Sequence, residues 1–179
     1  MKTRHVVLGI TGSIAAYKAC DLVSMLRKNE YEVSCVLTKE AARFVAPLAL
    51  ATLSGNRVYE DMFARPDRPE PEHISLAERA DVFVVCPASA TVIGKLASGI
   101  YDDLLTCSVC ATRAPVLIAP AMNNNMYGNT VVQGNIARLK KIGYKFIDPV
   151  KGRLACGQYA VGHLAGIPEI FGKIKKTLA

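Results

Sequence analysis

Three side chains in this sequence are of types that take part in chemistry: the imidazole of His73, the amide of Asn123 and the thiol of Cys156. An imidazole titrates near neutral pH and can act as a general base. An amide just beyond a strand can donate hydrogen bonds to a substrate carboxylate. Cys156 lies among Gly and polar residues, whereas most of the other cysteines lie in apolar segments. The plainer alternatives are a surface or capping His, a helix-capping Asn and a small loop residue.

A turn rich in small residues follows the first apolar run, in the sequence GITGSIAA (9–16). Small residues allow backbone N–H groups to approach an anion at the start of a helix. The turn departs from the GxGxxG fingerprint, and Thr38 rather than an acidic residue ends the second predicted strand. These features count against NAD and favour a mononucleotide phosphate. A tight strand-to-helix turn with Ser13 as its N-cap explains the same residues without a ligand.

Two later strand ends resemble each other, PASAT (87–91) and PAMN (120–123). Each has an apolar strand that ends at Pro, followed by a polar residue at the next helix start. Ser89 and Asn123 can cap these helices, and capping does not exclude ligand binding.

Strands and helices are predicted to alternate along the whole chain, with one Pro-rich surface loop at 64–72. This alternation predicts an α/β fold, a three-layer, doubly wound, Rossmann-like parallel sheet in one domain over residues 1–179. Ligands bind such sheets beyond the carboxyl ends of the strands, where we also expect a Gly-rich loop at 152–166. The predicted strands are 5–9, 32–38, 57–59, 81–87, 114–120 and 144–149. The predicted helices are 13–28, 39–53 with a break near Pro47, a short helix that starts at His73, 91–99, the second half of 123–141, and 168–178.

The composition fits this fold and excludes several classes of protein. Of 179 residues, 51% are hydrophobic and only 7% aromatic, so the core is aliphatic, as in a sheet buried on both faces. There is no uncharged apolar run of about 18 residues, so we expect no membrane span. The N-terminal apolar stretch is broken by glycines and lacks a clear cleavage site. The sequence therefore predicts a soluble, intracellular, cytoplasmic protein.

Charge and cysteine usage exclude further partners. The net charge is +7, but the excess is scattered and no aromatic residues interleave with it, so we expect no nucleic acid. The excess of Lys and Arg fits ordinary solvated helix faces. Its functional alternative is a mild attraction for phosphorylated small molecules. Cys107 and Cys110 form a single CxxC without a second pair or a nearby His, so we expect no metal. A disulfide framework is not expected in a chain of this size and aliphatic content.

Four segments resemble a known family: HISLA (73–77), PASATVIGKLASGIYDDLL (87–105), PAMNNNMY (120–127) and LACG (154–157). They occur in the order and spacing of the homo-oligomeric flavin-containing cysteine decarboxylases, and the resemblance covers nearly the whole chain. It implies FMN bound in a Rossmann-like fold at subunit interfaces, commonly in trimers or multiples of trimers. It also implies oxidative decarboxylation of a cysteine to an enethiol. In the coenzyme A branch of the family, which acts on a phosphorylated small molecule, the enethiol is then reduced.

The resemblance also implies roles for particular residues. His73 matches the family's catalytic His, and Cys156 matches the catalytic Cys on a substrate-clamping loop that completes the reduction. Asn123 matches the Asn that binds the substrate carboxylate, and Met126 and Ala155 accompany it in the substrate site. The residues that match the FMN-binding positions are Gly12, Ser13, Ile14, Thr38, Ser89, Ala90, Thr91, Val92 and Ala121.

The sequence departs from the family pattern at three places. Thr91-Val92 replaces Asn-Thr, Tyr127 replaces Trp, and residues 158–163 replace an acidic, Arg-bearing clamp. Because the chain stops near residue 179, the synthetase domain fused in many bacterial relatives is not expected.

Three alternatives stay open. A peptidyl-cysteine decarboxylase of peptide-antibiotic maturation shares the His and Asn, but it releases the enethiol and needs no clamp Cys. The second alternative is a non-enzymatic regulatory subunit of the same fold. Such proteins bind partners after losing the catalytic residues. A generic nucleotide-binding domain would leave the four matching segments unexplained.

Overall fold

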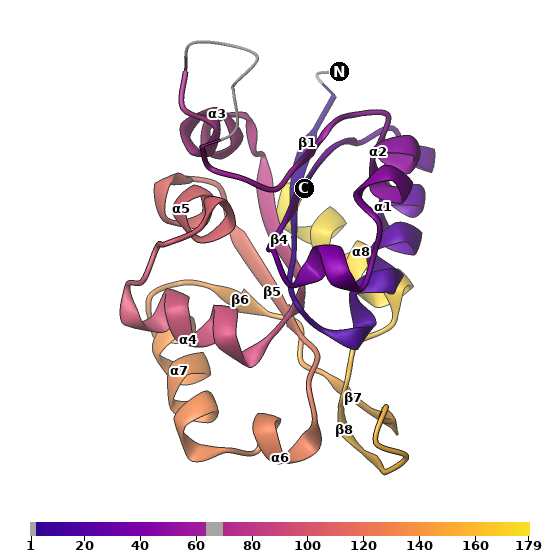
Figure 1. Ribbon diagram of the computed structural model, residues 1–179, viewed down its shortest axis with the longest axis vertical. Coiled ribbons are helices and arrows are strands. Elements are labelled where there is room, and N and C mark those ends of the chain that lie inside the picture. The colour runs from indigo at the N-terminus through magenta and orange to yellow at the C-terminus, as the bar shows by residue number, and fades with distance from the viewer. Residues whose placement is uncertain (1–2, 64–69) are drawn as a thin grey trace.

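The computed structural model describes residues 3–63 and 70–179, and its central feature is a six-stranded parallel sheet (Figure 1). The strand order is β3-β2-β1-β4-β5-β6, so the chain starts in the middle and winds outward in both directions. The strands are β1 (His5–Ile10), β2 (Glu32–Leu37), β3 (Val58–Tyr59), β4 (Val82–Ala88), β5 (Val116–Pro120) and β6 (Lys145–Phe146). The predicted doubly wound α/β fold is confirmed.

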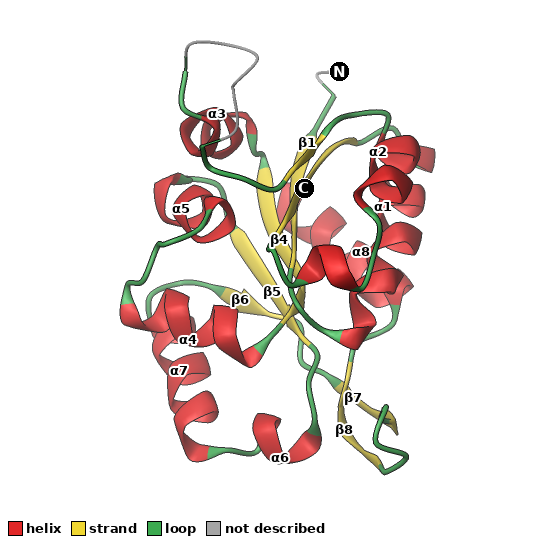
Figure 2. Cartoon of the chain, viewed as in Figure 1, coloured by secondary structure: helices red, strands yellow, loops and turns green. Residues whose placement is uncertain are grey.

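Helices cover both faces of this sheet, giving three layers (Figure 2). One face packs against α1 (Ala19–Lys28), α2 (Pro47–Ser54) and α8 (Ile167–Leu178). The other face packs against α3 (Glu72–Arg79), α4 (Ala90–Ser98), α5 (Leu104–Ala111) and α7 (Thr130–Lys141). The remaining helices are the 3₁₀ helices η1 (Ile14–Lys18) and η2 (Ala41–Arg43) and the short α6 (Asn124–Tyr127).

The residues of β1 show why an aliphatic run forms the centre of this fold. Val6, Leu8 and Ile10 pack on the α1 and α8 side, and Val7 packs on the opposite side. All four are fully buried. Burial of each such side chain contributes about 1.5–3 kcal/mol relative to exposure, so a strand apolar on both faces is stable only between two layers of helices.

The Gly-rich loop predicted at 152–166 is wrong, because part of this segment is an antiparallel hairpin. Strand β7 (Val150–Arg153) pairs with β8 (Tyr159–His163), and the N–H of Leu154 donates to the carbonyl of Gln158 at 2.7 Å to begin the turn. The two strands contain glycines and scattered charged residues, so they lack the clear alternation of apolar and polar residues that predicts a strand. In Figure 1 the hairpin extends beyond the ends of the central strands.

Other differences from the prediction are smaller. The helix predicted over 39–53 is divided into η2 and α2, and Pro47 begins α2, where its missing N–H costs nothing. Helix α5 was not predicted. Of the predicted loop at 64–72, residues 64–69 lie outside the described residues and Glu72 already belongs to α3. None of the helices in the described ranges has both the length and the apolar character needed to span a membrane.

Candidate functional site

A cavity of about 730 Å³ lies at the carboxyl ends of β1, β4 and β5, with the β7–β8 hairpin as one wall. This volume is in the usual range for small-molecule sites. It is the position at which ligands bind to doubly wound sheets. The predicted site residues that line it are Gly12, Ser13, Ile14, Ser89, Ala90, Thr91, Ala121, Asn123, Met126, Ala155 and Cys156.

Two hydroxyl groups tie the three strand ends together beneath this cavity. The buried Thr11 donates to the carbonyl of Pro87 at 2.7 Å and accepts from the N–H of Ser89 at 2.8 Å. The hydroxyl of Ser13 donates to the carbonyl of Ala121 at 3.1 Å. These hydrogen bonds therefore hold together the segments after β1, β4 and β5. An apolar substitution at Thr11 or Ser13 would remove them.

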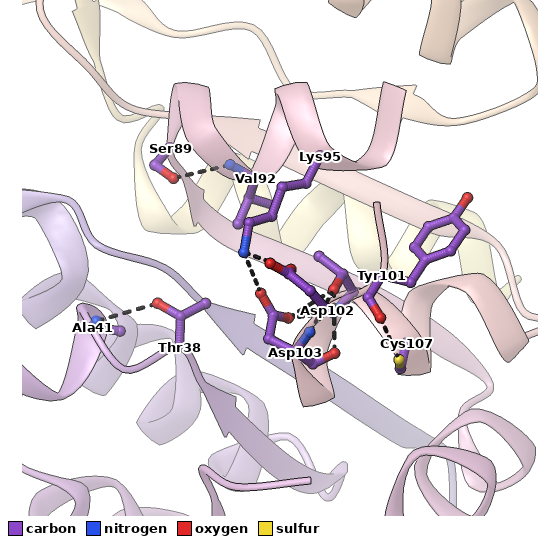
Figure 3. A network of polar contacts seen from close by, with 10 residues as sticks. Thr38, Ala41, Ser89, Val92, Lys95, Tyr101, Asp102, Asp103 and Cys107 are labelled. Atoms are coloured by element: carbon purple, nitrogen blue, oxygen red, sulfur yellow. Dashed lines mark hydrogen bonds and ion pairs between the residues drawn. The ribbon is translucent and has the colours of Figure 1, made fainter. Parts of the chain in front are cut away.

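The predicted helix caps are confirmed at all three segments. Ser13 accepts from the N–H of Ala15, and Ser89 accepts from the N–H of Val92, both at 3.3 Å (Figure 3 shows the second). Asn123 accepts from the N–H of Asn125 at 2.8 Å. Each cap satisfies a backbone donor that the helix leaves free. Because all three caps also line the cavity, the same residues fix the backbone and face any ligand.

The cap at Asn123 orients its amide group. The side-chain oxygen is engaged by the backbone, so the Nδ2 donor is turned toward Cys156, whose Sγ lies 3.6 Å away. An amide fixed in this way presents N–H donors, rather than its oxygen, to the cavity. The residue expected to bind the substrate carboxylate and the residue expected to complete the reduction of the enethiol are therefore in contact.

An ion-pair network supports the connection between α4 and α5 (Figure 3). The ammonium of Lys95 lies 2.7 Å from a carboxylate oxygen of Asp102 and 3.0 Å from one of Asp103. The hydrogen bonds that Lys95 donates, to Asp102 most of all and then to Asp103, raise the pKa of Lys95 against the opposing effect of burial. Asp103 also forms a capping box with Thr106 at the start of α5. This network anchors α4, whose first turn carries the cavity residues Ala90 and Thr91.

Three predicted site residues do not line the cavity. Thr38 is buried at the end of β2 and accepts from the N–H of Ala41 at 3.3 Å (Figure 3). Val92 is buried in α4. His73 is half-buried near the start of α3, which lies toward the end of the sheet where β1 begins, whereas the hairpin lies beyond the opposite end (Figure 1). Their roles remain predictions.

The cysteines differ in how available their thiols are. Cys86 is fully buried in β4, and this burial raises its pKa to about 12, so its thiol stays protonated. The thiol of Cys107 donates to the carbonyl of Tyr101 at 2.9 Å. Cys156 is exposed and lines the cavity. Within residues 3–63 and 70–179, no three His, Cys, Asp or Glu side chains gather in a way that would hold a metal ion.

The cavity also contains cationic and titratable side chains that sequence reasoning missed: Lys18, Arg153 and His163. The signal for Lys18 was its place five residues after Ser13, within the segment at the first strand end. Arg153 ends the first strand and His163 ends the second strand of a hairpin that was expected to be a loop, so nothing in the sequence predicted that they would face the first segment.

Gly162 docks the hairpin against the segment after β5. Its carbonyl accepts from the N–H of Met122 at 3.1 Å, its φ is +140°, and the carbonyl oxygen of Met122 occupies the space that a Cβ would need. We expect Gly162→Ala to displace the hairpin and speed hydrogen exchange at the Met122 amide, with a loss of about 1–3 kcal/mol in the free energy of unfolding. Urea unfolding and amide exchange measure these effects.

The matched control is Gly172→Ala in α8, where a Cβ meets no atom within 4 Å. It should be neutral or stabilise the protein by about 0.5–1 kcal/mol, because Ala is the better helix former. Equal exchange rates at Met122 in all three proteins would contradict the docking role of Gly162.

Comparison with known sequences matches the whole chain. The family model described as Flavoprotein covers residues 1–179. The chain is 46% identical over 179 residues to the coenzyme A biosynthesis bifunctional protein CoaBC of Bacillus subtilis, and it spans 44% of the length of that protein. It is 43% identical over 178 residues to a probable phosphopantothenoylcysteine decarboxylase of Streptococcus mutans, covering 98% of this chain and 99% of that protein.

Two solved structures have the same fold as this chain. A cysteine-to-serine variant of a PPC decarboxylase, complexed with pantothenoylaminoethenethiol, has a TM-score of 0.90 at 32% identity, covering 98% of both chains. The FMN-dependent cysteine decarboxylase SpaF has a TM-score of 0.86 at 28% identity, covering 99% of this chain and 98% of that one.

Proposed function

Because the chain belongs to the Flavoprotein family over its full length, we propose that it is an FMN-dependent decarboxylase of coenzyme A biosynthesis. Its reaction converts 4′-phosphopantothenoylcysteine to 4′-phosphopantetheine in the cytoplasm. Two relatives support the proposal: one at 43% identity is named a probable phosphopantothenoylcysteine decarboxylase, and one at 46% identity is named a bifunctional protein of coenzyme A biosynthesis. The observation that carries it is the contact between the amide of Asn123 and the thiol of Cys156 inside the cavity.

The residues that line the cavity suit FMN. Small side chains at Gly12, Ala15, Ala90 and Ala121 leave room for a flat ring close to the backbone. The hydroxyl groups of Ser13, Ser89 and Thr91 supply donors and acceptors for a ring edge, a ribityl chain or a phosphate. At Gly12 a Cβ would lie 2.6 Å from the Cβ of Glu40, so the first turn accepts no larger residue without movement. FMN would be held by the ends of β1, β4 and β5.

The reaction is redox-neutral overall. Loss of two electrons and two protons from the cysteine CH₂–SH unit gives a thioaldehyde. The Cα–carboxylate bond then breaks, CO₂ leaves, and its electron pair forms the C=C bond of an enethiolate. Addition of a proton and a hydride equivalent gives the CH₂–CH₂–SH product. When bound, FMN would supply the acceptor for these two electrons and the hydride equivalent for the last step.

The chain's own residues orient the substrate and move protons. The Nδ2 group of Asn123 donates to the substrate carboxylate and holds it in place without a fixed charge. The thiol of Cys156 lies on the hairpin next to Asn123, and it gives its proton to the enethiolate carbon that lost CO₂, while the hydride equivalent adds to the sulfur-bearing carbon. The hairpin also forms one wall of the cavity, so Cys156 lies beside the space that the substrate would occupy. His73 is the base that takes a substrate proton in the oxidation step.

A homo-oligomer, a trimer or a multiple of trimers, brings His73 to a cavity. Since His73 lies on α3 and does not line the cavity of its own chain, we place it at the cavity of a neighbouring subunit. The rim supports this arrangement, because the large apolar residues Ile14, Tyr17 and Met126 are 60%, 56% and 48% exposed there. Apolar patches of this kind mark surfaces that a partner covers.

Mixed oligomers test this arrangement. His73→Asn and Asn123→Asp subunits are each expected to be inactive alone. After denaturation and refolding as a mixture, about a quarter of the sites should combine an intact His73 with an intact Asn123 from the next subunit. We expect decarboxylation to recover in the mixture, measured as CO₂ release. No recovery in a mixture that light scattering shows to be oligomeric would place both residues in one chain's site.

The choice of substrate tests the function itself. Purified protein should release FMN on heating and convert 4′-phosphopantothenoylcysteine to 4′-phosphopantetheine, identified by mass. The rival, a peptidyl-cysteine decarboxylase, would act on a peptide with a C-terminal cysteine and stop at the enethiol. A protein that binds FMN but acts on neither substrate would support the non-enzymatic regulatory alternative.

A further inference from the structure

One wall of the cavity is cationic. Lys18 at the end of η1 and Arg153 at the end of β7 both line it, together with His163 at the end of β8. No Asp or Glu is found among the described residues that line this cavity. In the part of the chain that the structure describes, neither Lys18 nor Arg153 forms an ion pair with a carboxylate. This wall therefore has unneutralised positive charge that faces a ligand-sized space.

His163 fixes the position of Lys18. The Nζ of Lys18 lies 2.8 Å from the Nε2 of His163. An ammonium group can only donate, so Nε2 must be the unprotonated, accepting nitrogen of a neutral imidazole. This bond uses one of the three ammonium hydrogens and leaves two for a ligand. Both side chains are half-buried, which limits the water that screens their charge.

We infer that Lys18 and Arg153 bind the phosphate monoester of the substrate, and that His163 is the positioning residue for Lys18. The inference rests on the proposed function, because it names the part of that substrate which this wall recognises. Two cations from different elements, one from η1 and one from the hairpin, can contact different oxygens of one phosphate.

The substrate's other anion, the cysteine carboxylate, suits this wall less well. A cation paired with that carboxylate would stabilise a charge that is lost from the group as CO₂ leaves. Such pairing stabilises the ground state more than the transition state and slows the reaction. A neutral amide such as Asn123 holds the carboxylate at a lower cost to the rate, whereas the phosphate keeps its charge throughout and can be held by fixed cations.

FMN also carries a phosphate monoester, which is the other group that Lys18 and Arg153 could bind. The hairpin that carries Arg153 and His163 also carries Cys156, which acts on the substrate. The positions matched to FMN lie instead on the segments after the central strands, including Thr38, which does not line this cavity. Arg153 and His163 therefore lie on the substrate side, whereas Lys18 ends η1, whose first residue is matched to FMN, so FMN content is a separate readout.

The experiment compares FMN-loaded wild-type protein with Lys18→Gln and Arg153→Gln on two substrates, 4′-phosphopantothenoylcysteine and its dephosphorylated form. Each variant should lose about tenfold to a hundredfold in kcat/KM on the phosphorylated substrate, the effect of one charged hydrogen bond. On the dephosphorylated substrate it should change little. Lys151→Gln is the matched control, since Lys151 lies on the same strand, its ammonium is over the ring of Tyr159, and it does not line the cavity.

His163 is tested by two variants of different chemistry. His163→Gln keeps an acceptor for Lys18 and should retain most of the preference for the phosphorylated substrate. His163→Leu removes the acceptor and should lower that preference toward the level of Lys18→Gln. Equal preferences in these two variants would contradict the positioning role.

Calorimetry provides a readout that does not depend on turnover. Wild-type holoprotein should bind 4′-phosphopantothenate more tightly than pantothenate, and Lys18→Gln and Arg153→Gln should lose this preference. Equal losses on both substrates would assign the cations to the carboxylate, and loss of FMN from the variants would assign them to the cofactor; either result overturns the inference. Absence of turnover with either substrate, together with a retained preference in calorimetry, would overturn the proposed reaction but support the anion site.

Discussion

Replacement of Asn123 by Asp is expected to abolish decarboxylation while the fold and the bound FMN survive. The new carboxylate would face the carboxylate of the substrate, and like charges in a poorly solvated cavity repel each other by several kcal/mol. The Nδ2 donors would be lost as well. The fold should persist because Asp caps a helix as well as Asn does, so the bond from the Asn125 N–H is kept. We expect CO₂ release to fall at least about a hundredfold.

Asn125→Asp is the matched control. It makes the same change two positions away, on an exposed side chain that does not line the cavity. Its activity should stay near that of the wild type. If Asn123→Asp kept a near-normal rate with a normal flavin spectrum, Asn123 would not hold the substrate carboxylate.

Replacement of Cys156 by Ser is expected to stop the reaction at the enethiol. Oxidation and decarboxylation should proceed, because they depend on FMN, His73 and Asn123. The last protonation should become slow, since a serine hydroxyl is a far weaker acid than a thiol. Mass spectrometry should then detect a product two hydrogens lighter than 4′-phosphopantetheine. Cys156 is exposed at the cavity, so the substitution should change the free energy of unfolding little.

Cys110→Ser is the matched control, because Cys110 is also exposed but does not line the cavity. It should make the ordinary product at the ordinary rate. Ordinary product from Cys156→Ser would make Cys156 a plain loop residue. Release of the enethiol by the wild-type protein would favour the peptide-maturation alternative.

The sheet was predictable because its strands are aliphatic on both faces. The run over 81–87 could only be a buried strand, and it forms β4, in which every residue is buried. The order of strands and helices then followed from their alternation along the chain. The three segments that follow β1, β4 and β5 were found for the same reason, since the polar residues of a parallel sheet's binding edge come directly after its strands.

The cationic wall was not predictable from the sequence. Lys18 and His163 are separated by 145 positions, and their contact depends on how the hairpin docks. That docking depends in turn on the approach of Gly162 to Met122, which no local pattern records. Helix α5 was missed because it is almost entirely apolar and has no amphipathic period.

His73 shows a different limit. The resemblance implied a catalytic role for His73, but His73 lies on α3 and does not line the cavity of its own chain. A single sequence describes one subunit. The contacts of a residue at an interface depend on the neighbouring subunit as well, so they cannot be predicted from one chain alone. The mixed-oligomer experiment therefore bears on the part of the site that is hardest to predict.

We propose that one cavity both decarboxylates the substrate and reduces the resulting enethiol. The most direct test is a reaction of FMN-loaded protein with 4′-phosphopantothenoylcysteine under argon, without added reductant, in which CO₂ and thiol products are both quantified. We expect equal amounts of CO₂ and 4′-phosphopantetheine, with the flavin oxidised at the end. Accumulation of the enethiol with reduced flavin, or the absence of CO₂, would contradict the claim.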